Sequence, residues 1–256
     1  MDCVSTELDP VESIFRRAYE NNDLEKVKYI VGLGYDIDKS RAFLVSCLNG
    51  YFEMAKWIYF NMNVEEVSHY YAFIYACKSG HLEMAQWIDE IFTDTRYTRA
   101  EYATDAFVVA CNNDHLHVAK WLQTIGADIT TPDILIMPCI MGSIEFVEWL
   151  HSQNVDISNQ AAFIHACKSH HIDIIEFLID KYYKFNGYIK FDGVIDFDER
   201  INKLLIDSNV VHPKHLGQRD LKYYLEINNN CVPDDYICPF PEFTTKIRGK
   251  HTKSAR

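Results

Sequence analysis

Cysteine and histidine are the side chains of this sequence best suited to chemistry. Five of its eight cysteines recur at intervals of 28 to 34 residues, at Cys47, Cys77, Cys111, Cys139 and Cys167. Zinc ligation by thiolates uses closely paired cysteines such as Cys-x-x-Cys, and these five contain no such pair. We therefore predict reduced, buried thiols that fill tight contacts between helices.

Three histidines recur at one turn position, His81, His115 and His171. An imidazole at a turn can bond the backbone of a neighbouring unit, so we interpret these histidines as structural. His165 and His170 also lie near Cys167, which leaves a metal-dependent or other enzymatic activity around this sixth repeat as the alternative. The sequence has no nucleophile elbow, P-loop, HExxH or dinucleotide fingerprint. We expect no enzyme, no catalytic residues, no metal and no cofactor.

The elements that carry these residues are copies of one pattern, with units anchored at Tyr19, Cys47, Cys77, Cys111, Cys139 and Cys167. Each copy predicts two short helices joined by a turn. The first helix has a large apolar residue followed, three and four positions later, by a small residue and the anchor. The second helix carries every tryptophan of the chain, and with two of the cysteines we expect them to form the structural core: Trp57, Trp87, Trp121, Trp149, Cys77 and Cys111. A repeat of this length indicates a solenoid.

Two short helices, a Gly-His turn and a closing Gly-Ala-Asp-Ile (residues 126–129) resemble ankyrin repeats over roughly residues 11–184. The amino-acid sequence of the repeats resembles that of the divergent ankyrin repeat proteins of large DNA viruses. No copy opens with Thr-Pro-Leu-His, and three intervals are only 28 residues, which predicts shortened finger loops. The resemblance implies an all-α, ankyrin-like solenoid of about six repeats. It also implies a scaffold for protein–protein interaction, with a host protein as partner if the source is viral.

The predicted domains are the repeats over residues 1–184, a degenerate repeat or helical cap over 185–230 and an extended, basic, disordered tail over 231–256. In the cap we predict one helix over residues 194–207 and a second that opens at His212-Pro213. The third unit carries an insertion, residues 92–104, which we interpret as an exposed connector. In the fifth unit Pro138 replaces a small residue, and we expect a kinked or late-starting helix there.

Charge and hydropathy limit the classes of partner and the cellular locations that we expect for this protein. The formal charge is −12, although the last 14 residues contain five cations and no carboxylate side chain. An acidic body argues against nucleic acid as a partner of the repeats. The N-terminus lacks the apolar region of a signal peptide, and the longest apolar run, residues 134–141, is too short for a membrane span. We expect a monomeric intracellular protein, in the cytosol or nucleus, not secreted and not in a membrane.

The partner-binding surface is expected on the first helices. In an ankyrin-like unit, the residue just before the small pair points onto the concave face. That position holds Arg17, Val45, Tyr75, Val109, Met137 and His165, of which four are apolar or aromatic. Exposed apolar rows on a soluble protein mark partner sites, so Tyr75, Val109, Met137 and His165 are the candidate binding residues. The alternative is that this row packs against the next unit.

Overall fold

The structure is a computed structural model. It describes residues 10–62, 69–92, 96–131, 133–183, 188–189, 191, 195–229, 231–233, 235–239 and 248–249. Four of the five tail cations lie outside these residues, as do parts of the predicted tail, of the insertion and of the first cap helix. The chain divides into two compact units, Met1–Ile134 and Leu135–Arg256.

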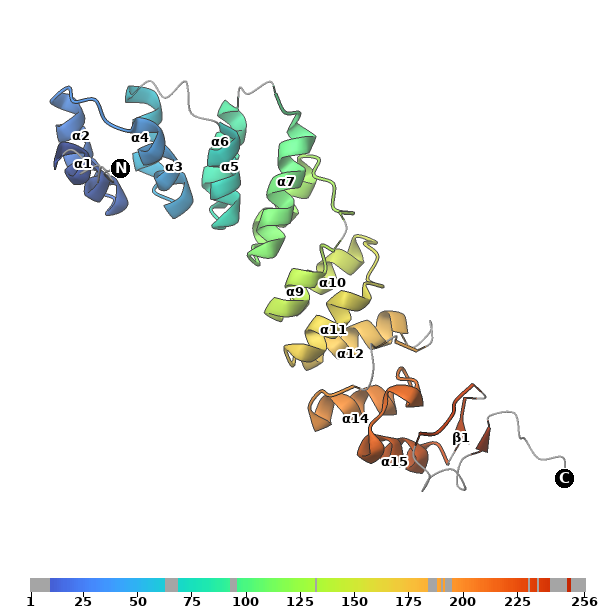
Figure 1. Cartoon of the computed structure of the whole chain (residues 1–256). Coiled ribbons are helices and arrows are strands. Elements are labelled where there is room, and N and C mark those ends of the chain that lie inside the picture. Colours follow the sequence, from blue (N-terminus) through green and yellow to red (C-terminus); the bar gives the residue numbers. More distant parts are fainter. Residues whose placement is uncertain are drawn as a thin grey trace, which may run out of the picture. The chain divides into compact units, whose positions relative to one another are not determined.

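The first unit consists of helical hairpins stacked side by side (Figure 1). Its first helices pack on one another in chain order, and each pairs with the second helix of its own hairpin. The hairpins are α1 (Pro10–Glu20) with α2 (Leu24–Gly32), α3 (Lys39–Asn49) with α4 (Phe52–Asn61), α5 (His69–Lys78) with α6 (Leu82–Ile91), and α7 (Arg99–Asn112) with α8 (Leu116–Thr124).

The second unit continues the pattern and then departs from it. Its hairpins are α9 (Ile136–Met141) with α10 (Ile144–Ser152), and α11 (Gln160–Lys168) with α12 (Ile172–Leu178), which runs on as a π-helical turn, η1 (Ile179–Tyr183). The remaining elements are α14 (Glu199–Asp207), the 3-10 turn η2 (Pro213–His215) and α15 (Gln218–Ile227), followed by the paired two-residue strands β1 (Cys231–Val232) and β2 (Arg248–Gly249). The predicted all-α, ankyrin-like solenoid is confirmed.

The core follows from the spacing of small and large residues on the first helices. In α5, Ala72, Phe73, Ala76 and Cys77 lie on one helical face, and none of them is exposed to solvent. The equivalent four side chains of α7 and of α11 are buried to the same extent. A buried phenyl ring contributes roughly 1.5–3 kcal/mol, and the small neighbours allow the second helix to approach closely.

The tryptophan position needs a correction, because only Trp87 is buried whereas Trp57, Trp121 and Trp149 are half-buried. The buried face of the second helices consists of other residues, such as Met84, Ala85 and Ile88 in α6. The tryptophan lies at the edge of that face and reaches the previous repeat. The ring of Trp87 lies 6.3 Å from that of Phe43, and the ring of Trp121 lies 6.0 Å from that of Phe73. Trp87 and Trp121 therefore cover the edge of the interface between their own repeat and the previous one.

The insertion of the third unit is also more than an exposed connector. Thr98 and Glu101 form a capping box that starts α7 a full turn early, so that this helix has 14 residues. The added turn brings in Tyr102, which is buried, stacks on Phe92 at 4.1 Å and donates its hydroxyl proton to Asp89 at 2.6 Å. Arg99 forms an ion pair with the same carboxylate. Arg96, Tyr97 and Arg99 remain exposed, as expected.

The late start predicted around Pro138 is confirmed. The helix α9 begins at Ile136, so that Pro138 lies in its first turn. A backbone N–H has no intrahelical acceptor at that place, and the missing proline donor is therefore tolerated. The proline is buried beside Cys139.

The cap has helices, although they begin later than predicted. The first begins at Glu199 because the Asp198 side chain accepts the Ile201 N–H at 2.8 Å and fixes the N-terminus there. At His212-Pro213 the chain makes only a 3-10 turn, and α15 begins after Gly217. Of the segment predicted as a tail, Val232, Pro233 and Tyr236 are buried, so this part packs on the cap. None of the helices in the described part of the chain has the length and apolar character that crossing a bilayer requires.

Candidate protein-binding face

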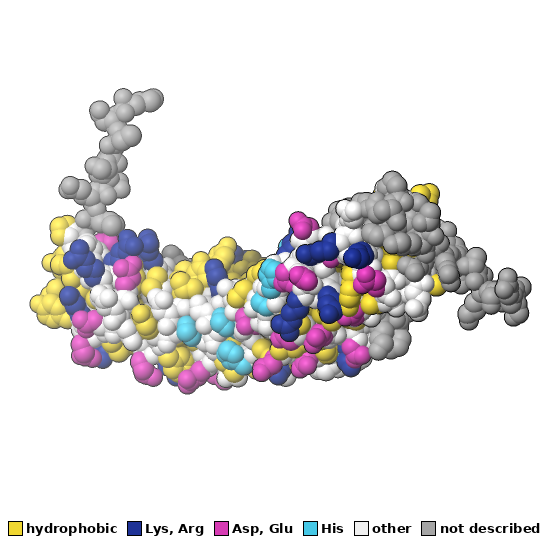
Figure 2. Space-filling view, turned by 90° about the horizontal axis from the view of Figure 1, so that it is seen from below, with side chains coloured by type: hydrophobic (Ala, Val, Ile, Leu, Met, Phe, Trp, Pro, Cys, Tyr) yellow, Lys and Arg dark blue, Asp and Glu magenta, His cyan; other side chains and the backbone are white. Residues whose placement is uncertain are grey.

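The turn histidines bond the preceding repeat, as predicted. The Nε2 of His81 lies 3.1 Å from the carbonyl oxygen of Leu48, and that of His171 lies 2.9 Å from the carbonyl oxygen of Ile140. His115 bonds the backbone of Lys78, and its pKa is lowered, chiefly because the ring is partly buried. Figure 2 shows several histidine side chains at the surface of the face that is seen from below.

Each of these imidazoles sits against a glycine of the repeat before it. Gly50, Gly80 and Gly142 have φ of +73°, +77° and +81°, the left-handed conformation that ends the first helix. A Cβ on any of the three would lie 2.5 to 2.7 Å from the next repeat's imidazole. Glycine is therefore needed here both for its backbone conformation and for the space it leaves. The histidines have a structural role.

The five repeat cysteines are free thiols without exposed surface: Cys47, Cys77, Cys111, Cys139 and Cys167. Burial raises the pKa of every one of them, to about 12 for Cys139 and Cys167. A neutral buried thiol is a poor nucleophile and a poor metal ligand. This environment agrees with a packing role.

The His- and Cys-rich sixth repeat does not assemble a metal site in the part of the chain that the structure describes. His171 is occupied by the Ile140 carbonyl, and His170 Nδ1 lies 2.5 Å from Asp198 Oδ2. No three His, Cys, Asp or Glu side chains of the described residues come close enough together to hold a metal ion. Nothing in these contacts favours the enzymatic alternative.

The candidate binding row is partly accessible. In the first unit, Val45, Tyr75 and Val109 are half-buried and Arg17 is exposed. In the second unit, Met137 and His165 are also half-buried. The five half-buried residues thus keep part of their surface in solvent, which is compatible with a binding role and with the alternative of packing against the next unit.

The structure adds a feature that the sequence argument missed, a chain of tyrosine rings that starts from Tyr75. Tyr71 lies one helical turn earlier on α5, 54% exposed, with ring centroids 6.5 Å from Tyr75 and 5.4 Å from Tyr70. Tyr70 stacks on Tyr97 of the insertion at 4.6 Å. We call these four residues the tyrosine ladder. The signal that could have found it is the i, i+4 spacing of Tyr71 and Tyr75, which places both on one helical face.

Opposite charges flank the tyrosine ladder. Arg41 on α3 and Asp105 on α7 occupy the repeat position that Tyr71 has on α5, and both are exposed. Asp105 accepts the hydroxyl proton of Tyr70 at 2.9 Å. Partial burial and this bond raise the pKa of Tyr70 to about 12, so the hydroxyl stays neutral and remains a donor. The face is therefore aromatic at its centre, basic toward the N-terminal repeats and acidic toward α7.

Comparison with known proteins supports an ankyrin repeat protein. Residues 102–188 match the family model of ankyrin repeats, in three copies. The matched stretch covers α8 to α12 and most of α7, and the earlier hairpins repeat the same core residues outside it. No curated protein matches the chain. Ankyrin repeats indicate a scaffold for protein interaction.

Proposed function

We propose that this protein binds a protein partner through the solvent-facing side of the first helices of its first unit. The observation that carries the proposal is the tyrosine ladder. Tyrosine is enriched in protein interfaces because its ring contributes a large contact area while its hydroxyl can still form hydrogen bonds. In the ladder, four rings run from the insertion to the middle of α5, and Tyr71 is more than half exposed.

The neighbouring row extends this surface. Val45 and Val109 stand at the position of Tyr75 on the helices to either side, and both keep part of their surface in solvent. Together with the ladder they form an apolar strip whose flanks are charged by Arg41 and Asp105. Such a strip suits a helix or an extended segment with apolar residues along one side. Met137 and His165 hold the same repeat position in the second unit, and we propose them as a separate candidate surface there.

The resemblance of the repeats to those of viral ankyrin proteins supports a host protein as the partner. The acidic body argues against nucleic acid. Burial raises the pKa of the repeat thiols and so keeps them unreactive, which argues against catalysis at the repeats. The partner is therefore sought among proteins.

The test is partner capture with paired variants. Full-length protein is used as bait, captured proteins are identified by mass spectrometry, and affinities of the recovered partner are measured for wild type, Tyr71→Ala and Val109→Glu. We expect each substitution to weaken binding at least tenfold, which corresponds to a loss of about 1.4 kcal/mol. The control is Gln86→Glu, on the exposed side of the second helix α6.

Thermal midpoints decide between binding and packing. If Val109→Glu abolishes binding at an unchanged midpoint, the row is a binding surface. A fall of several degrees in the midpoint would assign the row to the packing between units. Equal capture by wild type and both variants would remove this face from the function.

A further inference from the structure

The regular stacking of repeats ends at His170. This residue has the left-handed conformation, φ 61°, at the place where three other repeats have glycine. Asn22 and Asp114 share this conformation at the same repeat position, so His170 differs from them in its contact. Its Nδ1 bonds Asp198 at 2.5 Å, and the other oxygen of Asp198 caps α14.

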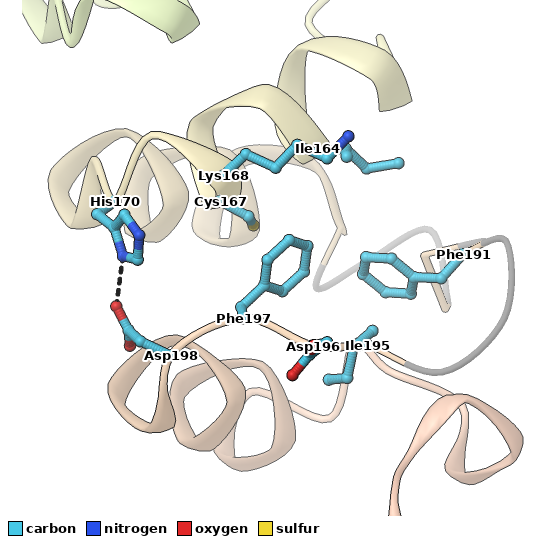
Figure 3. A pocket seen from close by; sticks show the side chains of 9 residues that line it. All are labelled: Ile164, Cys167, Lys168, His170, Phe191, Ile195, Asp196, Phe197 and Asp198. Atoms are coloured by element: carbon cyan, nitrogen blue, oxygen red, sulfur yellow. Dashed lines mark hydrogen bonds and ion pairs between the residues drawn. The ribbon is translucent and has the colours of Figure 1, made fainter.

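A pocket of about 480 Å³ lies beside this contact, between α11 and the segment that leads into α14 (Figure 3). Ile164 and Cys167 line it from α11, and Phe191, Ile195 and Phe197 line it from the opposite side. The two phenyl rings lie 6.1 Å apart at 65°. Ile195 is held in place by its N–H, which donates to the carbonyl of His215 at 2.7 Å. The described residues of these two walls are therefore apolar.

The rim carries one available charge of each sign. Lys168 extends along the α11 side and Asp196 lies on the opposite side (Figure 3). Both are exposed, and within the described part of the chain neither has an ion-pair partner. His170 and Asp198 pair with each other at one end of the pocket.

We propose that this pocket binds a peptide segment of a protein partner that packs one large apolar side chain against Phe191 and Phe197, on the side of the rings that faces Ile164. The charges at the rim select an acidic residue on the Lys168 side of that anchor and a basic residue on the Asp196 side. The volume lies in the range of ligand pockets. Because Ile164, Phe191 and Phe197 are only half-buried, the site suits a side chain that brings its own backbone as a cover. The site belongs to the second unit and does not depend on the tyrosine ladder.

The probe is a fluorescein-labelled, end-capped peptide, Gly-Glu-Phe-Lys-Gly, titrated with the full-length protein by fluorescence polarisation. Replacing its phenylalanine by alanine is expected to weaken binding about tenfold or more, because the transfer of a phenyl group into an apolar pocket is lost. Equal affinity of the two peptides would overturn the proposal. Equally strong competition by N-acetyl-phenylalanine amide would make the site a small-molecule pocket and would also overturn it.

Charge reversal tests the rim without disturbing the apolar walls. Lys168→Glu is expected to weaken binding of Gly-Glu-Phe-Lys-Gly about fivefold and to strengthen binding of Gly-Lys-Phe-Lys-Gly. Lys78→Glu is the matched control, because Lys78 ends α5 at the same repeat position and lies in the other unit. Identical behaviour of the two variants would refute the assignment of the rim. Val109→Glu should leave peptide binding unchanged, which separates this result from the test of the proposed function.

Discussion

At the scale of the residue, the junction between repeats depends on a glycine and a histidine that touch. Gly80 has φ +77°, and a Cβ added there would lie 2.7 Å from Nδ1 of His115. Gly34 has almost the same conformation, φ +78°, with nothing within 4 Å of the added atom. Comparing substitutions at Gly34 and Gly80 therefore separates the cost of backbone strain from the cost of the steric conflict with His115.

We predict that Gly34→Ala lowers the free energy of unfolding by about 1–2 kcal/mol, the cost of a left-handed alanine. Gly80→Ala should lose about 1–3 kcal/mol more, because the neighbouring imidazole must move. Urea denaturation of both variants measures the difference. Adding His115→Ala to Gly80→Ala should recover part of the extra loss. Equal losses for the two alanine variants would show that the contact does not matter.

The repeat thiols give a second prediction at this scale. Burial raises the pKa of Cys139 and Cys167 to about 12, and it also raises the pKa of Cys47, Cys77 and Cys111. Almost no thiolate is therefore present at pH 8. All five should be modified by iodoacetamide only after unfolding, whereas the half-buried Cys231 and Cys238 should react in the folded protein. Peptide mapping by mass spectrometry gives the rate for each site. Fast modification of the five in the native state would contradict their burial.

At the scale of the element, the added first turn of α7 is joined to α6 by a buried carboxylate. The side chain of Asp89 is only 7% exposed and is held by Arg99 and by the hydroxyl of Tyr102. Tyr102→Phe leaves the ring stack on Phe92 intact and removes one donor from the buried acid. We expect a loss of about 1–3 kcal/mol in unfolding free energy, the cost of an unmade bond to a buried charge.

Tyr70→Phe is the matched control for this prediction. It also removes a hydroxyl from an aspartate, but Asp105 is exposed and water can replace the donor. The control should cost less than about 0.5 kcal/mol in the same urea titration. A cost for Tyr102→Phe no larger than that of Tyr70→Phe would mean that Asp89 is satisfied without the tyrosine.

The elements could be predicted from the sequence wherever they repeat. The spacing of Phe and Ala-Cys correctly predicts the buried face of α5, α7 and α11, and Pro138 correctly predicts the late start of α9. Both predictions depend on local sequence alone. The half-burial of Trp57 could not be predicted, since it depends on how far the neighbouring hairpin extends over the rim. Tyr102 and Asp198 were missed for a similar reason, as each acts through a partner in another element.

The contact made by His170 had no clear signal in the sequence. Gly50, Gly80 and Gly142 each lie against a histidine of the next repeat, whereas His170 bonds Asp198, the N-cap residue of α14. Asn22 and Asp114 also replace this glycine and keep its left-handed conformation, so a side chain at this position does not by itself indicate a changed junction. The resulting pocket is still beyond sequence reasoning, because its far wall comes from a segment with no repeat register.

At the scale of the whole molecule, the division at Ile134 makes the first unit a candidate for independent folding. In repeat proteins each unit contacts mainly its neighbours, and three or more repeats can bury a continuous core. The first unit contains four hairpins with their own buried phenylalanines, Phe15, Phe43, Phe73 and Phe107. It also contains the entire tyrosine ladder.

We therefore predict that a fragment of residues 1–134 is helical by circular dichroism and unfolds cooperatively, at a lower midpoint than the full chain because it has fewer repeats. The fragment should bind the partner of the full-length protein with an affinity within about threefold, since the ladder and Val109 are all present. A fragment that is folded but does not bind would move the partner site to the second unit. A fragment that fails to fold would show that the two units depend on one another for stability, and affinity would then be compared in full-length protein carrying Tyr71→Ala.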